Sequence, residues 1–139
     1  MSHDALMQVV ASLFSIIASL TGLPLNSDTL PEVQFVPHSQ IEAMACQQPC
    51  RIQAIYLPHL GIFLDQDLDV VNDDYARSIL LHELVHHAQA VMAKYEDLSL
   101  CESWKSSEAE AYKIQDYYLV RVGSARRIMP GIAQRLRCD

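Results

Sequence analysis

The pentapeptide HELVH at residues 82–86 is the part of the sequence best suited to chemistry. Its histidines, His82 and His86, are four positions apart, which places them about 40° apart around a helix, so both imidazoles can bind one metal ion. Glu83 is turned by about 100° from His82, beside the metal position. A carboxylate there can take a proton from a metal-activated water that attacks a carbonyl group. The pattern predicts a zinc-dependent hydrolase with Glu83 as general base.

The residues around the motif predict a helix that Asn72 or Asp73 caps and that runs to Tyr95. Its apolar residues form a stripe opposite the histidines, made by Leu80, Leu84, Ala88 and Val91 and widened by Leu81, Val85 and Met92. One side of this helix should therefore lie in the core while the other presents ligands at the floor of a cleft. The alternative is a metal-free helix whose histidines share a face by chance.

The stretch ILLHELVHHAQ at residues 79–89 resembles the active-site helix of zincin metallopeptidases. Zincins differ in their third metal ligand. Metzincins extend the motif to HExxHxxGxxH, but Gln89 stands here in place of the glycine. Gluzincins, the thermolysin-like group, take a glutamate from a following helix, often within ExxA. Glu108 begins such a motif 22 positions after His86 (108 − 86), so the chain looks like a gluzincin.

This resemblance implies one Zn²⁺ per chain, held by His82, His86 and Glu108, and hydrolysis of a peptide or protein substrate. Glu83 would act as base and then protonate the leaving amine. The alternative function is a non-catalytic zinc-binding or protein-interaction module that retains the zincin fold. The intact Glu83 favours the enzyme, because a purely structural site needs no base. A second copy or a partner is expected to complete the cleft, because the chain is too short for the further domain of thermolysin-like enzymes.

Glu110 competes with Glu108 for the third ligand position. Two positions on a helix differ by about 200°, so only one of the two can face the metal. Ser107 and Glu110 have the spacing of a capping box, which predicts a helix over residues 107–122 and gives Glu110 a structural task. This reasoning favours Glu108 as the ligand.

Other residues near the motif are expected to have weaker roles. His87 is turned by about 100° from His86 and should be structural or support the site. Gln89 lies one turn beyond His86 and could line the cleft. Tyr112 is one of several tyrosines that could donate a hydrogen bond to an oxyanion, and Trp104 is expected in the core.

The other elements predict a small α+β domain, in which a hairpin-based sheet is flanked by the motif helix and the helix that supplies the third ligand. Residues 30–36 resemble an edge strand, and residues 52–57 and 62–64 form a hairpin around a Pro/Gly turn that contains His59. Ser39 followed by Glu42 predicts a capped helix to Ala45. His38 and His59, both at turns, are expected to be solvated.

Residues 5–27 contain no charge and are long enough to span a membrane. Their polar residues nevertheless share one helical face, formed by Gln8, Ser12, Ser15 and Ser19. This pattern favours a core helix, ended by Gly22 and Pro24, over a membrane span. No basic residue precedes the apolar stretch, so a signal peptide is not expected.

Length and charge narrow the class of protein. The 139 residues predict a single domain over residues 1–139. The resemblance to zincins implies that this is a minimal metallopeptidase-like domain. With 10 Lys plus Arg against 17 Asp plus Glu, the net charge is −7, which argues against a nucleic-acid partner.

The four cysteines, Cys46, Cys50, Cys101 and Cys138, allow three disulfide pairings. A local Cys46–Cys50 bridge would leave Cys101 for Cys138. A metal site and free buried thiols remain alternatives. Disulfides would favour an exported or periplasmic protein, and free thiols a cytoplasmic one.

Overall fold

The helix that carries HELVH begins where the sequence predicts. In the computed structural model, which describes residues 2–22 and 27–138, Asp73 caps helix α3 (Asp74–Val91) by accepting hydrogen bonds from two amides of the first turn. The helix stops short of the predicted end at Tyr95. The backbone is left-handed at Ala93 and Tyr95 (φ 53° and 68°), which a continuing helix does not permit.

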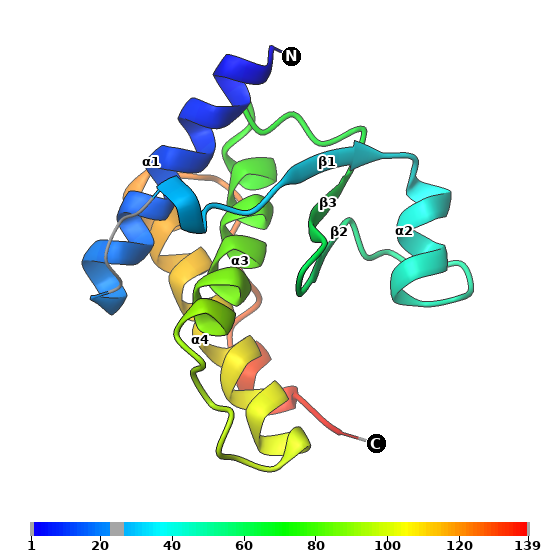
Figure 1. Cartoon of the computed structure of the whole chain (residues 1–139), viewed down its shortest axis with the longest axis vertical. Coiled ribbons are helices and arrows are strands. Elements are labelled where there is room, and N and C mark those ends of the chain that lie inside the picture. The colour runs from blue at the N-terminus through cyan, green and yellow to red at the C-terminus, as the bar shows by residue number, and fades with distance from the viewer. Residues whose placement is uncertain (1, 23–26, 139) are drawn as a thin grey trace.

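The described residues form four α-helices and a sheet of three short strands, which confirms the α+β class (Figure 1). Helix α3 crosses the middle of the molecule, with α1 and α4 against it and α2 at the far edge of the sheet. The other elements in chain order are α1 (His3–Thr21), η1 (Ser27–Thr29), β1 (Val33–Val36), α2 (His38–Ala45), β2 (Ala54–Leu57), β3 (Gly61–Asp65), α4 (Leu100–Arg121) and η2 (Ile132–Arg135).

The sheet has the order β1-β3-β2, with β1 parallel and β2 antiparallel to the central β3. This arrangement confirms both the predicted edge strand and the predicted hairpin. Gly61, which starts β3, has φ +107°, and a Cβ atom there would lie 2.4 Å from the carbonyl oxygen of Glu32. Only glycine fits this turn without shifting the backbone.

Helix α1 buries one face, as its sequence pattern predicts. The buried residues are Leu6, Val10, Leu13, Phe14 and Ile17. The predicted polar face is exposed, and Gly22 ends the helix, whereas Pro24 lies outside the described residues. Among the described helices, α1 alone is long and apolar enough to cross a membrane, and 28% of that stretch is buried inside the protein.

Helix α2 starts one residue before the predicted cap. Pro37 is its N-cap, and no side chain caps the helix, so the predicted capping box of Ser39 and Glu42 is wrong. Glu42 accepts a hydrogen bond from the amide of Cys50 instead. This carboxylate therefore binds a backbone amide of the loop that follows the helix, and not one in the first turn of the helix.

Helix α4 starts earlier than predicted, at Leu100. Ser99 caps it by accepting a hydrogen bond from the amide of Glu102. The S-x-x-E pattern that starts the helix is therefore Ser99–Glu102 and not the predicted Ser107–Glu110. Ser107 lies inside the helix and donates to the carbonyl oxygen of Trp104. The first turns of α4 project beyond the end of α3 (Figure 1). Trp104 is therefore 43% exposed, and its predicted place in the core is wrong.

Two disulfides are formed, one between Cys46 and Cys50 and one between Cys101 and Cys138. This pairing is one of the three that the sequence allows. The second bridge ties the segment after α4 back to the first turn of that helix. Two disulfides are compatible with an oxidising compartment.

We expect Cys138→Ser to lower the free energy of unfolding by about 4 kcal/mol, because the lost bridge closes a long loop in the unfolded chain. Chemical denaturation of the oxidised proteins measures the difference. Thiol titration of denatured, unreduced wild-type protein should find no free thiol. Four free thiols would contradict both bridges.

Candidate metal centre

Three predicted ligands meet between two helices. His82 and His86 come from α3, and Glu108 reaches them from α4. The carboxylate oxygens of Glu108 lie 3.5 Å from Nε2 of His82 and 2.5 Å from Nε2 of His86. One ligand atom from each residue lies within 4.8 Å of the other two. His82 is buried and the other two are half-buried, so a small ion could be enclosed by all three.

Glu83 lies beside this cluster. Its Oε2 is 3.9 Å from Nε2 of His82, and the residue is only 8% exposed. The backbone amide of Tyr56, on β2, donates a hydrogen bond to it. Burial raises the pKa of Glu83 above its ordinary value, although the two histidines oppose the shift. A carboxyl group with a raised pKa is suited to exchange protons near neutral pH.

His82 is oriented by Gln115, a residue that no motif predicts. Oε1 of Gln115 lies 2.9 Å from Nδ1 of His82. The amide nitrogen of Gln115 donates to Oγ of Ser78, whose own proton goes to the carbonyl oxygen of Tyr75. The amide oxygen must therefore face His82, so Nδ1 carries a proton and Nε2 faces the cluster. The only sequence signal for Gln115 is its position two helical turns after Glu108, on the same face.

Gln89 holds His86 in the same way. Its Oε1 lies 2.9 Å from Nδ1 of His86, and its amide nitrogen donates to the carbonyl oxygen of Ser107 and to Glu110. Gln89 is buried, and its contacts support a histidine. Both histidines are thus fixed with Nδ1 as donor.

Glu110 faces away from the cluster. One oxygen accepts from Gln89, and the other lies 2.5 Å from Nζ of Lys94. Burial would raise the pKa of Glu110, but Lys94 and Gln89 outweigh burial and lower it. Its predicted capping role is wrong because α4 begins at Leu100. The expectation that Glu108 and Glu110 point in different directions is confirmed.

The cluster favours a positive charge at its centre. Burial would raise the pKa of Glu108, but the hydrogen bonds and charges of His82 and His86 lower it to about 2. For His86 burial has the opposite sign and would lower the pKa, but Glu108 and Glu83 outweigh burial and raise it. Glu108 is therefore a carboxylate whose negative charge faces two imidazole nitrogens.

Tyr112 lies next to the cluster, one helical turn after Glu108. Its ring packs edge-on against His82, with 4.6 Å between the centroids. Burial raises the pKa of Tyr112, and the charges of Glu108 and Glu83 add to this effect. The phenol is therefore neutral and able to donate a hydrogen bond.

The remaining histidines lie outside the cluster. His87 bonds the hydroxyl of Tyr56 and the carbonyl oxygen of Thr29, which confirms the structural role expected for it. His59 is exposed in the hairpin turn, as predicted. His38 is not simply solvated, because both of its ring nitrogens have protein partners.

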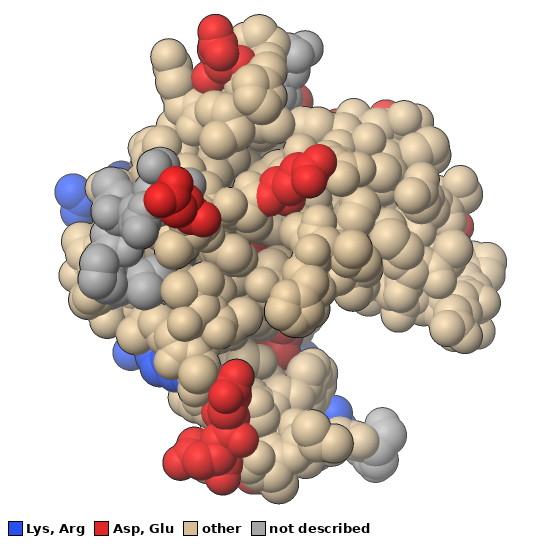
Figure 2. Space-filling model, viewed as in Figure 1, with Lys and Arg blue, Asp and Glu red and all other residues tan. Residues whose placement is uncertain are grey.

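The surface is hollowed on the side of the sheet. Figure 2 shows a deep notch between the lobe formed by the sheet and α2 and the projecting end of α4. Helix α3, which carries both histidines, packs against β2 on one side and against α4 on the other.

Comparison with known proteins gives a family. The model of the family described as Domain of unknown function (DUF6647) matches residues 3–129. The chain belongs to this family. The matched region includes HELVH, Glu108 and both supporting glutamines, and it ends before Cys138. No curated protein and no solved structure matches the chain.

Proposed function

We propose that this protein is a zinc-dependent hydrolase of the zincin type, a peptidase in which His82, His86 and Glu108 bind one Zn²⁺. The observation that carries the proposal is the meeting of these three side chains beside a buried Glu83 with a raised pKa. Two imidazole nitrogens and one carboxylate oxygen are the ligand set of thermolysin-like catalytic zinc sites.

The residues fit such an ion. Both histidines have Nδ1 engaged by a glutamine and Nε2 turned to Glu108, as a metal-binding imidazole requires. In the part of the chain that the structure describes, no fourth His, Cys, Asp or Glu joins the group. Three protein ligands favour a catalytic site over a structural one, which is normally closed by four.

The protein's own side chains would handle the protons. When bound, Zn²⁺ would supply Lewis-acid chemistry, which can lower the pKa of water to about 7. Glu83 would take the proton released during attack on the carbonyl carbon and deliver it to the leaving nitrogen. Its raised pKa suits it to both steps. The neutral phenol of Tyr112 would donate a hydrogen bond to the developing oxyanion.

The substrate and location follow from the same features. We propose a peptide or protein substrate in the notch beside α3, completed by a second copy or a partner. The acidic net charge of −7 supports neither a nucleic-acid substrate nor a nucleic-acid partner. The burial of one face of α1 supports a core helix over a membrane span. The two disulfides support an exported or periplasmic location.

Metal analysis combined with a cleavage assay tests the proposed function. We expect about one zinc per chain, and cleavage of a mixed peptide library that a chelator abolishes and added zinc restores. Stoichiometric zinc without cleavage would favour the non-catalytic binding module. A protein that takes up no zinc would refute the proposal.

The supporting residue Gln115 provides a second prediction. Gln115→Met keeps the side-chain size but removes the acceptor for Nδ1 of His82, so zinc affinity should fall about 10–100-fold. A chelator competition measures the affinity, with Gln40→Met on the exposed side of α2 as control. Unchanged affinity in Gln115→Met would show that His82 does not need this hydrogen bond.

A further inference from the structure

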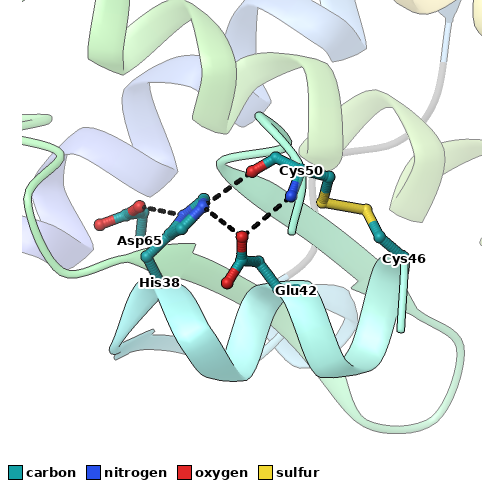
Figure 3. Close-up of a disulfide and its surroundings, with 5 residues drawn as sticks. All are labelled: His38, Glu42, Cys46, Cys50 and Asp65. Carbon is teal, nitrogen blue, oxygen red and sulfur yellow. Dashed lines mark hydrogen bonds and ion pairs between the residues drawn. A yellow bond between two sulfur atoms is a disulfide. The ribbon is translucent and has the colours of Figure 1, made fainter. Parts of the chain in front are cut away.

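His38, the first residue of α2, joins three parts of the chain (Figure 3). Its Nδ1 lies 2.8 Å from Oδ2 of Asp65 at the end of β3, and its Nε2 lies 2.9 Å from the carbonyl oxygen of Cys50. The His38 side chain is 38% exposed, whereas that of Asp65 is 7% exposed. The ring therefore connects a helix start, a buried carboxylate and the loop closed by a disulfide.

Both partners of the ring are acceptors. A carbonyl oxygen has no proton to give, and a carboxylate accepts at both oxygens. A neutral imidazole has one N–H, so it could satisfy only one of these two contacts. The arrangement fits an imidazolium, which donates from both nitrogens. The pKa of His38 is raised, first by the backbone hydrogen bond to Cys50 and then by Asp65.

The charges around the ring favour the same state. Asp65 faces it from β3, and Oε2 of Glu42 on α2 lies 3.4 Å from Nε2. Within the described residues, neither acid has an ion pair with Lys or Arg. Loss of the proton from His38 would leave two carboxylates around a neutral ring. The contacts would then weaken through loss of a donor and loss of charge attraction.

The disulfide holds the other side of this arrangement. Cys50 is bonded to Cys46, its amide donates to Glu42, and its carbonyl oxygen accepts from His38 (Figure 3). The bridge between Cys46 and Cys50 thus limits where the Cys50 backbone can lie. By linkage, if the closed bridge favours the protonated ring, the protonated ring must favour the closed bridge to the same extent.

We propose that protonated His38 couples the Cys46–Cys50 disulfide to the sheet in a pH-dependent way, through its hydrogen bonds to Asp65 and Cys50. We call these two hydrogen bonds the clasp; both form at low pH, and the clasp is lost at high pH. The clasp does not depend on the proposed zinc chemistry. Cys50 lies four residues before Ala54, the first residue of β2, and the amide of Tyr56 on this strand donates to Glu83. The clasp therefore anchors the start of the strand that contacts the proposed general base.

The direction of the pH effect follows from the raised pKa. A group whose pKa is higher in the folded than in the unfolded protein stabilises the fold fully below its unfolded value. That contribution is lost as the pH rises through the folded value. The clasp should thus be complete below the ordinary histidine pKa of 6.5 and lost on the alkaline side of the raised value.

An NMR titration of His38 is the first test. We expect a pKa above 6.5 in the oxidised protein, and a lower value in the Cys46→Ser/Cys50→Ser variant. A pKa at or below 6.5 in the oxidised protein would overturn the proposal. So would an identical value in both proteins, because it would show no coupling to the bridge.

Equilibrium reduction by dithiothreitol is the second test, and Cys101–Cys138 serves as reference within the same molecule. In each reaction two electrons and two protons pass from the dithiol to the disulfide, giving two protein thiols and cyclic oxidised dithiothreitol. Differential alkylation and mass spectrometry then quantify the two bridges separately. Their ratio cancels the pH dependence that is common to both reactions.

Below the measured pKa of His38, we expect His38→Gln to raise the equilibrium constant for reduction of Cys46–Cys50 about threefold to tenfold relative to that of Cys101–Cys138. This range corresponds to the loss of a partly exposed hydrogen bond to a charged group. About two pH units above that pKa, the difference should vanish. His59→Gln, in the exposed hairpin turn, is the matched histidine control and should change nothing. An effect of His38→Gln that is absent at low pH, or equal at all pH values, would overturn the clasp.

Discussion

Glu83→Gln should bind zinc with wild-type stoichiometry while cleaving peptides at least about a hundredfold more slowly. Glutamine keeps the shape of the side chain and can remain in the buried position beside the cluster. It cannot take a proton, so the change removes a carboxylate that lies next to the proposed ligands but is not itself proposed to hold the ion. Elemental analysis and a peptide cleavage assay on the same preparations measure the two properties.

The control for this variant is Glu102→Gln, an exposed glutamate in the first turn of α4. It should keep both zinc and activity. Loss of zinc from Glu83→Gln to the level found in His82→Ala or His86→Ala would make Glu83 a ligand. Full activity in Glu83→Gln would remove it from the mechanism.

Glu108→Ala should lose stoichiometric zinc, as should His82→Ala and His86→Ala. Each change removes one of the three proposed ligands, so the loss of affinity should exceed the roughly hundredfold effect of removing a supporting residue. The structure provides a matched comparison in Glu110→Ala, two positions away on the same helix. Glu110 contacts Lys94 and Gln89 and not the ligand atoms, so its removal should weaken zinc binding only through Gln89.

A chelator competition ranks these variants, and circular dichroism shows whether each one is folded. The reverse order, with Glu110→Ala the weaker binder, would move the third ligand to Glu110. That outcome would require α4 to rotate about its axis relative to the orientation described, because only one of the two carboxylates can face α3 at a time.

The sequence by itself determined the features that depend on residues close together in the chain. The i, i+4 spacing of His82 and His86 fixes their shared face once a helix forms, and Asp73 marks where that helix begins. The hairpin follows from two apolar runs around a turn, and Gly61 is needed there for a positive φ. These local signals are sufficient for the α+β class.

The tertiary structure decided which distant residues meet. Two S-x-x-E patterns could start the last helix, and the chain uses the one at Ser99, which changes the roles of Ser107 and Glu110. Gln115 supports His82 from 33 positions away, and His38 reaches Asp65 across 27. Such contacts depend on how α3, α4 and the sheet pack, because a side chain's partners are set by the surface against which its element is buried. Periodicity specifies that a face is buried, but it does not specify the residues that lie opposite.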